Sequence, residues 1–445
     1  MPVAEPRSSA SNRLSRSEWG VLAVFVAIQF THIVDFVIIM PLGDRLRREL
    51  EITPDQFGSV IAAYAWAAGL ASLVASFAMD RFDRKTILIT MYGGFAVSTL
   101  VCGLAPNYEW LLVSRTLAGV FGGLAAVALM SAIGDVFPPE KRGRATGAVI
   151  SAFAVASIIG LPIGLVLADE FGRGAPFLAL AALSGVVWVV ALVRLPAIRG
   201  HLNAERRHPI TEFVAVIREP NHLAGFAFSF FLILGTFTVA SFVGPVLCAM
   251  NGWSEQKLAV IYFVAGLCTL VSTNVVGRLA DRMPRLPLFR VLGFGALVLA
   301  LILGNLPPGP LWVATIAVAS FMVFAAGRMV PAQAMMLGAA RPAVRGAFMS
   351  LNTSVQHFAT GLAPTIAGAI LVEGPDRKLE GFPIVGMVSA SAAAVSLVLA
   401  GLLKPAPQHA VNKRRDDTPR EAHVPDVVLQ KAFIPAPSPR HGDSA

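Results

Sequence analysis

The sequence predicts an all-α membrane protein with twelve transmembrane helices, arranged as two six-helix bundles related by pseudo-two-fold symmetry. Three observations predict this fold: scarce charge, repeated long apolar segments and an internal repeat. Of the 445 residues, 55% are hydrophobic and 14% are charged, whereas an average soluble domain carries about 25% charged residues. Charge this sparse cannot cover a surface that faces water, so we expect an outer belt that faces lipid.

A membrane-spanning helix needs about 20 mostly apolar residues. Twelve segments of this kind, interrupted by Pro, Gly or charged residues, follow one another along the chain. In order, they lie near 19–41, 57–79, 86–104, 110–132, 145–168, 175–194, 222–248, 257–277, 287–306, 310–333, 346–372 and 382–403. The segments at 57–79 and 257–277 are the most mixed in composition, so their ends are the least sharply marked.

The longest hydrophilic break divides these spans into two sets of six. We predict a cytoplasmic N-terminal tail (1–18), a first bundle (19–194), a central cytoplasmic loop (195–221), a second bundle (222–403) and a cytoplasmic C-terminal tail (404–445). The central loop contains ITEFVAVIREP, an amphipathic stretch expected to lie on the inner membrane surface. The C-terminal tail is rich in Pro and charge, so we expect it to be disordered.

Basic residues alternate along the chain. Most of the 36 Lys and Arg lie in the two tails and in every second connecting segment. Because Lys and Arg stay on the cytoplasmic side of a membrane, both termini are predicted to be cytoplasmic. The same asymmetry accounts for the net charge of +9 without a nucleic-acid partner. The first span is too long for the apolar core of a signal peptide, so we expect it to remain uncleaved.

An internal repeat relates the two sets of spans. Residues 55–85 and 255–285 each begin with an acidic residue and Gln, continue through an apolar span and end near Asp-Arg. Arg144 opens the span that ends in GLPIG, and Arg345 opens the one that contains GLAPTIAG. Chance likeness between apolar spans is the alternative, but the polar positions repeat as well. Two halves in the same order imply a parallel repeat, with substrate bound between them near the midplane.

The loop after the second span is similar to that of the major facilitator superfamily, and the resemblance covers about residues 18–403. The family motif is Gly-x-x-x-Asp-Arg-x-Gly-Arg-Lys, and here Ser76 and Asp83 replace its two glycines. The residues that match its charges are Asp80, Arg81, Arg84 and Lys85, and the second half repeats the opening at Gly277, Asp281 and Arg282. In the resembling family these charges latch the cytoplasmic ends of the two halves, which implies a conformational gate. A role in setting topology alone is the alternative.

Two further stretches resemble family motifs. Arg115-x-x-x-Gly119 in the fourth span is similar to the second family motif. In the fifth span, drug antiporters have Gly-Pro-x-x-Gly-Gly. Here Gly160, Pro162 and Gly164 stand in that region, with the Pro one place late and Leu165 at the last Gly. We predict that Gly160 and Pro162 bend or thin this helix where the halves meet.

Asp35 is an acid inside the first apolar span, in the stretch THIVDFVIIMPLG, and His32 lies on the same helix face. A carboxylate at a helix centre costs about 2.5–3.5 kcal/mol on insertion scales, so it should face the protein interior. Asp35 and Arg115 lie at similar depths, about 8–9 Å from the outer ends of their helices, which permits an ion pair. We predict a proton-coupling site of Asp35, His32 and Arg115, because burial favours the neutral acid and a nearby cation the charged one. A purely structural ion pair is the alternative.

Other side chains within the spans are candidates for a substrate cavity. They are Asn352, Gln356, His357, Arg328, Gln333, Phe36, Tyr64 and Phe231. Asn352 and Gln356 are four residues apart and share a helix face, although polar residues also hold spans together. Arg328 lies in the inner half of its span, where it could instead snorkel or close the inner gate.

The sequence contains no GxxxxGK[ST] phosphate loop, no HExxH and no nucleophile constellation, so we expect neither an ATP-driven pump nor an enzyme. Its three cysteines lie apart in apolar spans, and we expect no disulfide, metal or cofactor. The resemblance implies a monomeric secondary transporter in a bacterial cytoplasmic membrane, a proton-coupled antiporter that exports small organic molecules by alternating access. A proton symporter that imports a metabolite, for which Arg115 and Arg328 favour an anion, and a ligand-binding sensor without flux are the alternatives.

Overall fold

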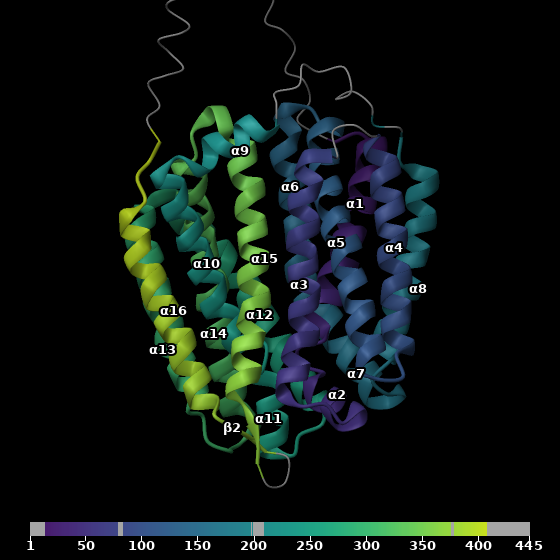
Figure 1. The fold of residues 1–445 in the computed structure, drawn as a ribbon, viewed down its shortest axis with the longest axis vertical. Coiled ribbons are helices and arrows are strands. Elements are labelled where there is room, and N and C mark those ends of the chain that lie inside the picture. Colours follow the sequence, from purple (N-terminus) through teal and green to yellow (C-terminus); the bar gives the residue numbers. More distant parts are fainter. Residues whose placement is uncertain (1–13, 79–82, 197, 199–208, 375–377, 407–445) are drawn as a thin grey trace, which may run out of the picture. The chain divides into compact units, whose positions relative to one another are not determined.

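The computed structural model describes residues 14–78, 83–196, 198, 209–374 and 378–406, and helices dominate it. The described residues have the all-α fold that the sequence predicts (Figure 1). The predicted tails, apart from a few residues beside the bundles, lie outside the described residues.

The first half, residues 14–198, contains six long helical segments and one short helix. They are α1 (Arg16–Ile38), α2 (Gly43–Leu50), α3 (Pro54–Ala78), α4 (Arg84–Leu104), α5 (Tyr108–Val136), α6 (Pro139–Val155) continued by the π-helical turn η2 (Ala156–Gly160) and α7 (Leu161–Phe171), and α8 (Ala175–Arg194). Capping residues set several of the starts: Ser15 and Glu18 form a capping box at α1, and Asn107 caps α5.

The second half, residues 209–406, repeats this order. It contains α9 (Pro209–Ile217), α10 (Pro220–Ala240), α11 (Val243–Asn251), α12 (Glu255–Arg282), α13 (Arg285–Gly304), α14 (Leu311–Ala339), η4 (Pro342–Val344), α15 (Arg345–Ile370), the strands β1 (Val372–Glu373) and β2 (Leu379–Glu380), and α16 (Phe382–Leu402). The strands form a two-stranded antiparallel hairpin that the sequence did not predict. The amphipathic stretch of the predicted central loop folds as α9.

Among the described residues, eleven helical segments are long and apolar enough to cross a membrane. They correspond in order to the predicted spans, except that α15 is absent from this set. α15 is 26 residues long, but it carries Arg, Asn, Gln and His and is more polar than the others. It runs beside α3 (Figure 1), so the count of twelve spans stays a prediction that depends on this helix.

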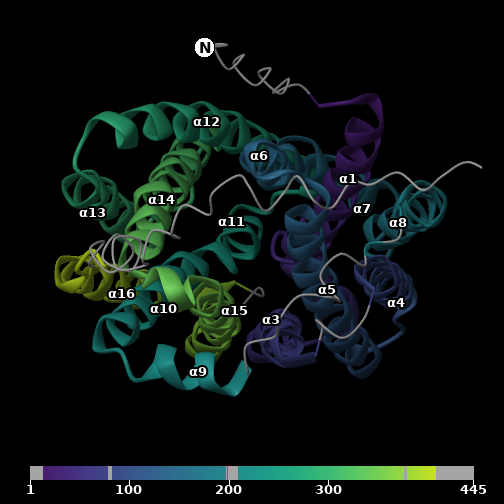
Figure 2. The same cartoon turned by 90° about the horizontal axis from the view of Figure 1, so that it is seen from above.

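The two halves meet along two seams. α3 packs against α15 on one side, and η2 and α7 pack against α12 on the other (Figure 2). The first span of each half is broken near one end: α1 gives way to α2, and α10 to α11. These two short helices contact each other across the halves. We call this end of the bundle the α2/α11 end, and the opposite end, beside α9, the α9 end (Figure 1).

Candidate functional site

A buried ion pair lies at the centre of the first half. Arg115 of α5 donates from Nη1 to Asp35 Oδ2 of α1 at 2.8 Å, and to the Asp35 carbonyl oxygen at 3.2 Å. Both side chains are fully buried. The sequence analysis anticipated that these two residues can meet, and the structure brings them together.

Two neighbours complete the surroundings of this pair. Thr99 of α4 donates to Asp35 Oδ1 at 3.2 Å. The Arg115 guanidinium lies 4.4 Å from the centre of the Tyr64 ring of α3, within the range of a cation–π contact. Asp35 therefore accepts hydrogen bonds on both carboxylate oxygens, and helices α1, α3, α4 and α5 all contribute to holding the pair.

His32 lies beside this cluster without joining the ion pair. Its ring centre is 6.1 Å from that of Tyr64 and 5.6 Å from that of Phe95. The His32 Nε2 and Tyr64 hydroxyl atoms are both buried and have no hydrogen-bond partner in the described part of the chain, and each would lie 2.8 Å from a Cβ built at Gly122. The structure thus leaves His32 next to the acid but shows no direct hydrogen bond between them.

The aromatic candidates of the first half connect this cluster to the second half. The Tyr64 ring lies 5.5 Å from the Phe36 ring, and Phe36 lies 5.9 Å from Phe237 of α10. Phe36 follows Asp35 directly in α1, so the residue next to the acid touches the other half.

The α2/α11 end is closed by tight packing between the halves. A side chain at Gly43 would collide with Phe57 and Pro245, and one at Gly244 would approach the Cβ of Pro41 to 3.4 Å. Phe57 of α3 meets Phe242 edge to face at 5.4 Å. Glycine at these two positions therefore permits the backbones of the two halves to approach closely.

Ion pairs between the halves reinforce this closure. Glu255 of α12 accepts from Arg45 Nε at 3.1 Å and lies 3.8 Å from Arg48 Nη2. Arg47 pairs with Glu373 at 2.6 Å. Arg48 also pairs with Asp44 at 3.1 Å; burial raises the pKa of the Asp44 carboxyl, and Arg48 and Arg47 oppose that shift. Several of these groups are shielded from solvent, so their attraction is screened less than that of exposed pairs.

We expect Glu255→Gln to loosen the α2/α11 end. Glu255 is 3% exposed, and removing one partner of a buried ion pair costs about 3–5 kcal/mol. Native Cys248 of α11, which is buried at the same end, reports the opening. In purified protein with Cys102 and Cys268 replaced by Ala, maleimide labelling of Cys248 should accelerate at least about tenfold, which corresponds to about 1.4 kcal/mol.

Glu109→Gln is the matched control for this measurement, because Glu109 is exposed at the start of α5 and takes part in none of the described ion pairs. Its labelling rate should equal that of the parent. Equal rates for Glu255→Gln and the parent would show that these charges do not hold the halves together.

The predicted gate residues lie at the α9 end, and the structure describes only some of them. Asp80 and Arg81 lie outside the described residues. Arg84 is buried and pairs with Asp135 of α5 at 3.3 Å, within the first half. Lys85 is half-buried at the start of α4, whereas Asp281 and Arg282 are exposed at the end of α12, near Gly277. The inter-half ion pairs that the structure describes lie at the other end.

The fifth-span motif packs against the helix that carries Asp35. Pro162 has no amide hydrogen, so it cannot donate to the carbonyl oxygen one turn earlier, and the π-helical turn η2 precedes it. A side chain at Gly160 would collide with Val34 of α1, and a Cβ at Gly164 would lie 2.6 Å from Ile38 Cδ1. The two glycines therefore allow this helix to lie close to α1.

We expect Gly160→Ala to destabilise the protein by about 1–3 kcal/mol, because the added methyl group overpacks the contact with Val34. Gly147→Ala is the matched control, since a Cβ at Gly147 meets no atom within 4 Å. Thermal unfolding in detergent should therefore show a lower Tm for Gly160→Ala than for Gly147→Ala. Identical Tm values would contradict the close approach of η2 to α1.

The polar candidates of the second half are dispersed over α14 and α15. Arg328 is buried and donates from Nη2 to Thr236 Oγ1 at 2.7 Å and to the Leu232 carbonyl oxygen at 3.3 Å, both on α10. It therefore does not snorkel to a helix end. Asn352 is buried, and its Oδ1 atom has no hydrogen-bond partner among the residues that the structure describes; Gln333 is exposed.

The remaining candidates lie along α15 and α10. His357 is half-buried, and its Cβ packs against Gly69 of α3 across the seam between the halves. Gln356 is half-buried on the same helix. Phe231 packs edge to face on Phe230, with the ring centres 5.5 Å apart. No described contact gathers these three residues around Asp35.

Several residues of the site were missed by the sequence analysis. They are Thr99, Thr236, Phe237, Arg45, Arg47, Arg48, Glu255 and Glu373. The three arginines carried a usable signal, because they form a basic group in a segment predicted to lie outside, where Lys and Arg are normally scarce. Thr99 and Thr236 carried none, since a threonine in an apolar span usually bonds to its own helix.

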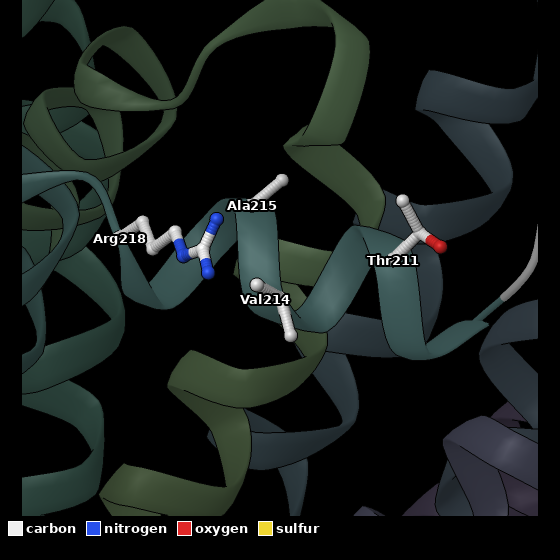
Figure 3. Close-up of a pocket in the computed structure, with 4 residues that line it drawn as sticks. All are labelled: Thr211, Val214, Ala215 and Arg218. Atoms are coloured by element: carbon white, nitrogen blue, oxygen red, sulfur yellow. The ribbon is translucent and has the colours of Figure 1, made fainter.

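A surface pocket lies on α9, away from this site (Figure 3). Its lining residues, Thr211, Val214, Ala215 and Arg218, follow a spacing of one helix turn and lie on one face of α9 and the residue after it. The buried groups described above belong to other helices, so this pocket contributes nothing to them.

Comparisons with known proteins show the family. The sequence model of the Major Facilitator Superfamily matches residues 25–364. The chain is 25% identical over 345 residues to an uncharacterized MFS-type transporter of Bacillus subtilis, covering 78% of this chain and 87% of that protein. It is 26% identical over 305 residues to the purine ribonucleoside efflux pump NepI of Escherichia coli, covering 67% and 75%. A probable sugar efflux transporter of Helicobacter pylori is 25% identical over 274 residues, covering 61% and 69%.

Solved structures share the fold at lower identity. A bacterial homologue of the human lysosomal transporter Spinster, in an inward-facing and unoccupied conformation, matches with a TM-score of 0.66 and 16% identity, covering 88% of this chain and 95% of that one. A D-xylose–proton symporter matches with a TM-score of 0.68 and 14% identity, covering 85% and 97%. Both likenesses concern the arrangement of helices.

Proposed function

The chain belongs to the major facilitator superfamily and is an integral membrane transporter, and we propose that it exports small organic molecules in exchange for protons. Efflux is the activity in the names of two relatives, one for sugars and one for purine ribonucleosides. The proposed orientation has both termini in the cytoplasm of a bacterial cell, which puts the α2/α11 end outside.

The observation that carries this proposal is the fully buried ion pair of Asp35 and Arg115. Arg remains charged under all conditions, whereas a carboxylate gains or loses a proton. Protonation of Asp35 removes one charge of the pair and leaves Arg115 held by the Asp35 carbonyl oxygen and the Tyr64 ring. An acid of this kind inside a span is a natural carrier for the coupling proton.

The position of Asp35 supports a link between its protonation and the movement of the halves. Its neighbour Phe36 touches Phe237 of the other half, and α1 leads directly into α2, which carries Arg45 and Arg47. In the proposed cycle, Asp35 releases its proton to the cytoplasm as substrate binds while the α2/α11 end is closed, and this change alters the seam at Phe36. Release of the α2/α11 closure then exposes the site to the outside, where the substrate leaves and Asp35 takes up a proton.

Vesicle orientation tests the direction and the coupling. Inverted membrane vesicles with an acidic interior should accumulate at least one compound of a panel of sugars, purine ribonucleosides and organic anions, and a protonophore that collapses the gradient should abolish this uptake. Proton-driven accumulation in right-side-out vesicles alone would identify an importer instead. Binding without flux in either orientation would identify a sensor and refute transport of the panel compounds.

A further inference from the structure

Arg328 makes hydrogen bonds in the second half that resemble those of Arg115 in the first, although it lies further along its helix: Arg115 is the eighth residue of α5 and Arg328 is the eighteenth of α14. α5 and α14 are each the fourth span of their half, and each arginine donates to the first span of the same half. Arg115 bonds to one side-chain oxygen and one carbonyl oxygen of α1. Arg328 bonds to one side-chain oxygen and one carbonyl oxygen of α10.

The sequence repeat aligns the two acceptors. Asp35-Phe36 is followed by Gly43, where α2 begins, and Thr236-Phe237 is followed at the same spacing by Gly244 in α11. Gly43 and Gly244 both lie at the contact between the halves, and Phe36 and Phe237 touch each other. Thr236 therefore stands where the first half has Asp35.

This replacement leaves the second half with an unbalanced charge. In the first half, Asp35 neutralises Arg115. Thr236 supplies only a neutral hydroxyl, and within the described part of the chain no carboxylate forms an ion pair with Arg328. The Arg328 side chain is 1% exposed, and among the described residues its Nε and Nη1 atoms have no hydrogen-bond partner. Two nitrogens of Arg115 are unpartnered in the same sense, so the two arginines differ in the carboxylate that pairs with Arg115.

A buried, unpaired guanidinium is costly, because Arg cannot lose its charge and water does not solvate it there. Natural spans therefore pair such residues or use them to bind ions and substrates. The Arg328 groups that remain free to form hydrogen bonds are N–H donors. A partner that completes them therefore supplies oxygen lone pairs and negative charge.

We propose that Arg328 binds the negatively charged group of the transported molecule, and that the substrate is an organic anion carrying a carboxylate or phosphate. This rests on the proposed transport function and adds its substrate class. Arg328 supplies the unpaired donors, and the half-buried rings of Phe36 and Phe237 lie beside Thr236 for an apolar portion of the substrate. The two arginines then have matching roles, one neutralised by the protein and one by its cargo.

Thr236→Asp provides the sharpest test, because it installs the counter-ion that Asp35 supplies in the first half. Purified protein is titrated with sodium acetate, benzoate, phosphate and chloride at constant ionic strength, with benzamide as the neutral partner of benzoate. At least one carboxylate or phosphate should raise the Tm of the parent, and benzamide should not. In Thr236→Asp and in Arg328→Gln the apparent Kd of that anion should increase at least about tenfold.

Thr238→Val is the matched control, because the Thr238 hydroxyl of the same helix donates to the Leu234 carbonyl oxygen and is not described as bonding to Arg328, so this variant should retain anion binding. If Thr236→Asp fails to fold, Arg328→Gln still decides the outcome. The proposal is overturned if no carboxylate or phosphate raises the Tm of the parent more than it raises the Tm of Arg328→Gln. It is also overturned if chloride is the only anion that raises the Tm of the parent more. Because these measurements need no gradient, failure of proton-coupled export would leave this result standing, and the reverse also holds.

Discussion

Replacing Asp35 by Asn is expected to abolish proton-coupled export. Asn has nearly the same shape, and its one carbonyl oxygen still accepts the hydrogen bond of Arg115 when its amide nitrogen faces the Thr99 hydroxyl, but it cannot take up a proton. Gradient-driven accumulation in inverted vesicles should therefore fall to the level of vesicles without the transporter. In detergent, substrate-driven proton release from the purified protein should disappear. Unchanged proton release would exclude Asp35 as the coupling acid.

A double variant separates coupling from a structural role of the ion pair. Asp35→Asn leaves the Arg115 charge buried without its partner, which should destabilise the protein by about 3–5 kcal/mol. Adding Arg115→Gln removes that unpaired charge and should restore most of the thermal stability. If the pair only ties α1 to α5, the double variant regains transport together with stability. If Asp35 carries the proton, stability returns and proton-coupled flux does not.

Cross-linking Pro41→Cys to Gly244→Cys is expected to arrest transport completely. A Cβ built at Gly244 lies 3.4 Å from the Cβ of Pro41 in the other half, close to the usual separation in a disulfide of about 3.5–4.5 Å. The bond would lock the α2/α11 end, so the halves could not separate there. Flux should cease after mild oxidation and return on reduction with dithiothreitol.

The cross-linking experiment needs a background free of native thiols, with Cys102, Cys248 and Cys268 replaced by Ala. Each single cysteine variant is a control, and both should transport equally before and after oxidation. If the cross-linked protein transports as fast as the protein reduced with dithiothreitol, opening of this end is not part of the cycle. The proposal of alternating access through the α2/α11 end would then be abandoned.

Much of the fold could be predicted from the sequence, because insertion into a membrane depends on local composition. The apolar segments, their order and the resemblance to the superfamily follow from runs of about 20 residues. The sequence also permitted an ion pair between Asp35 and Arg115, because the two residues lie at similar depths, but it left their contact open. A charge inside lipid is so unfavourable that it must face the interior and find a partner, and few partners exist at the right depth.

Other parts of the site could not be predicted, because they depend on which faces of distant helices meet. Glu255 was visible only as the start of a repeat, and nothing in its neighbourhood pointed to Arg45 in the other half. Likewise, whether the charge of Arg328 is neutralised depends on residue 236 of another helix, which is a threonine and not an acid. Neither hydropathy nor spacing reports the rotation of one helix against another.

The sequence by itself determined that this chain crosses a membrane, that its two halves repeat, and that an acid and an arginine inside the spans lie at depths that permit an ion pair. Only the tertiary structure decided that the halves close at the α2/α11 end and that one buried arginine is neutralised while its counterpart is not. The physical reason is that hydrophobic insertion is a sum over neighbouring residues, whereas ion pairs and close glycine contacts arise between residues that are far apart in the sequence, such as Asp35 and Arg115 or Arg45 and Glu255.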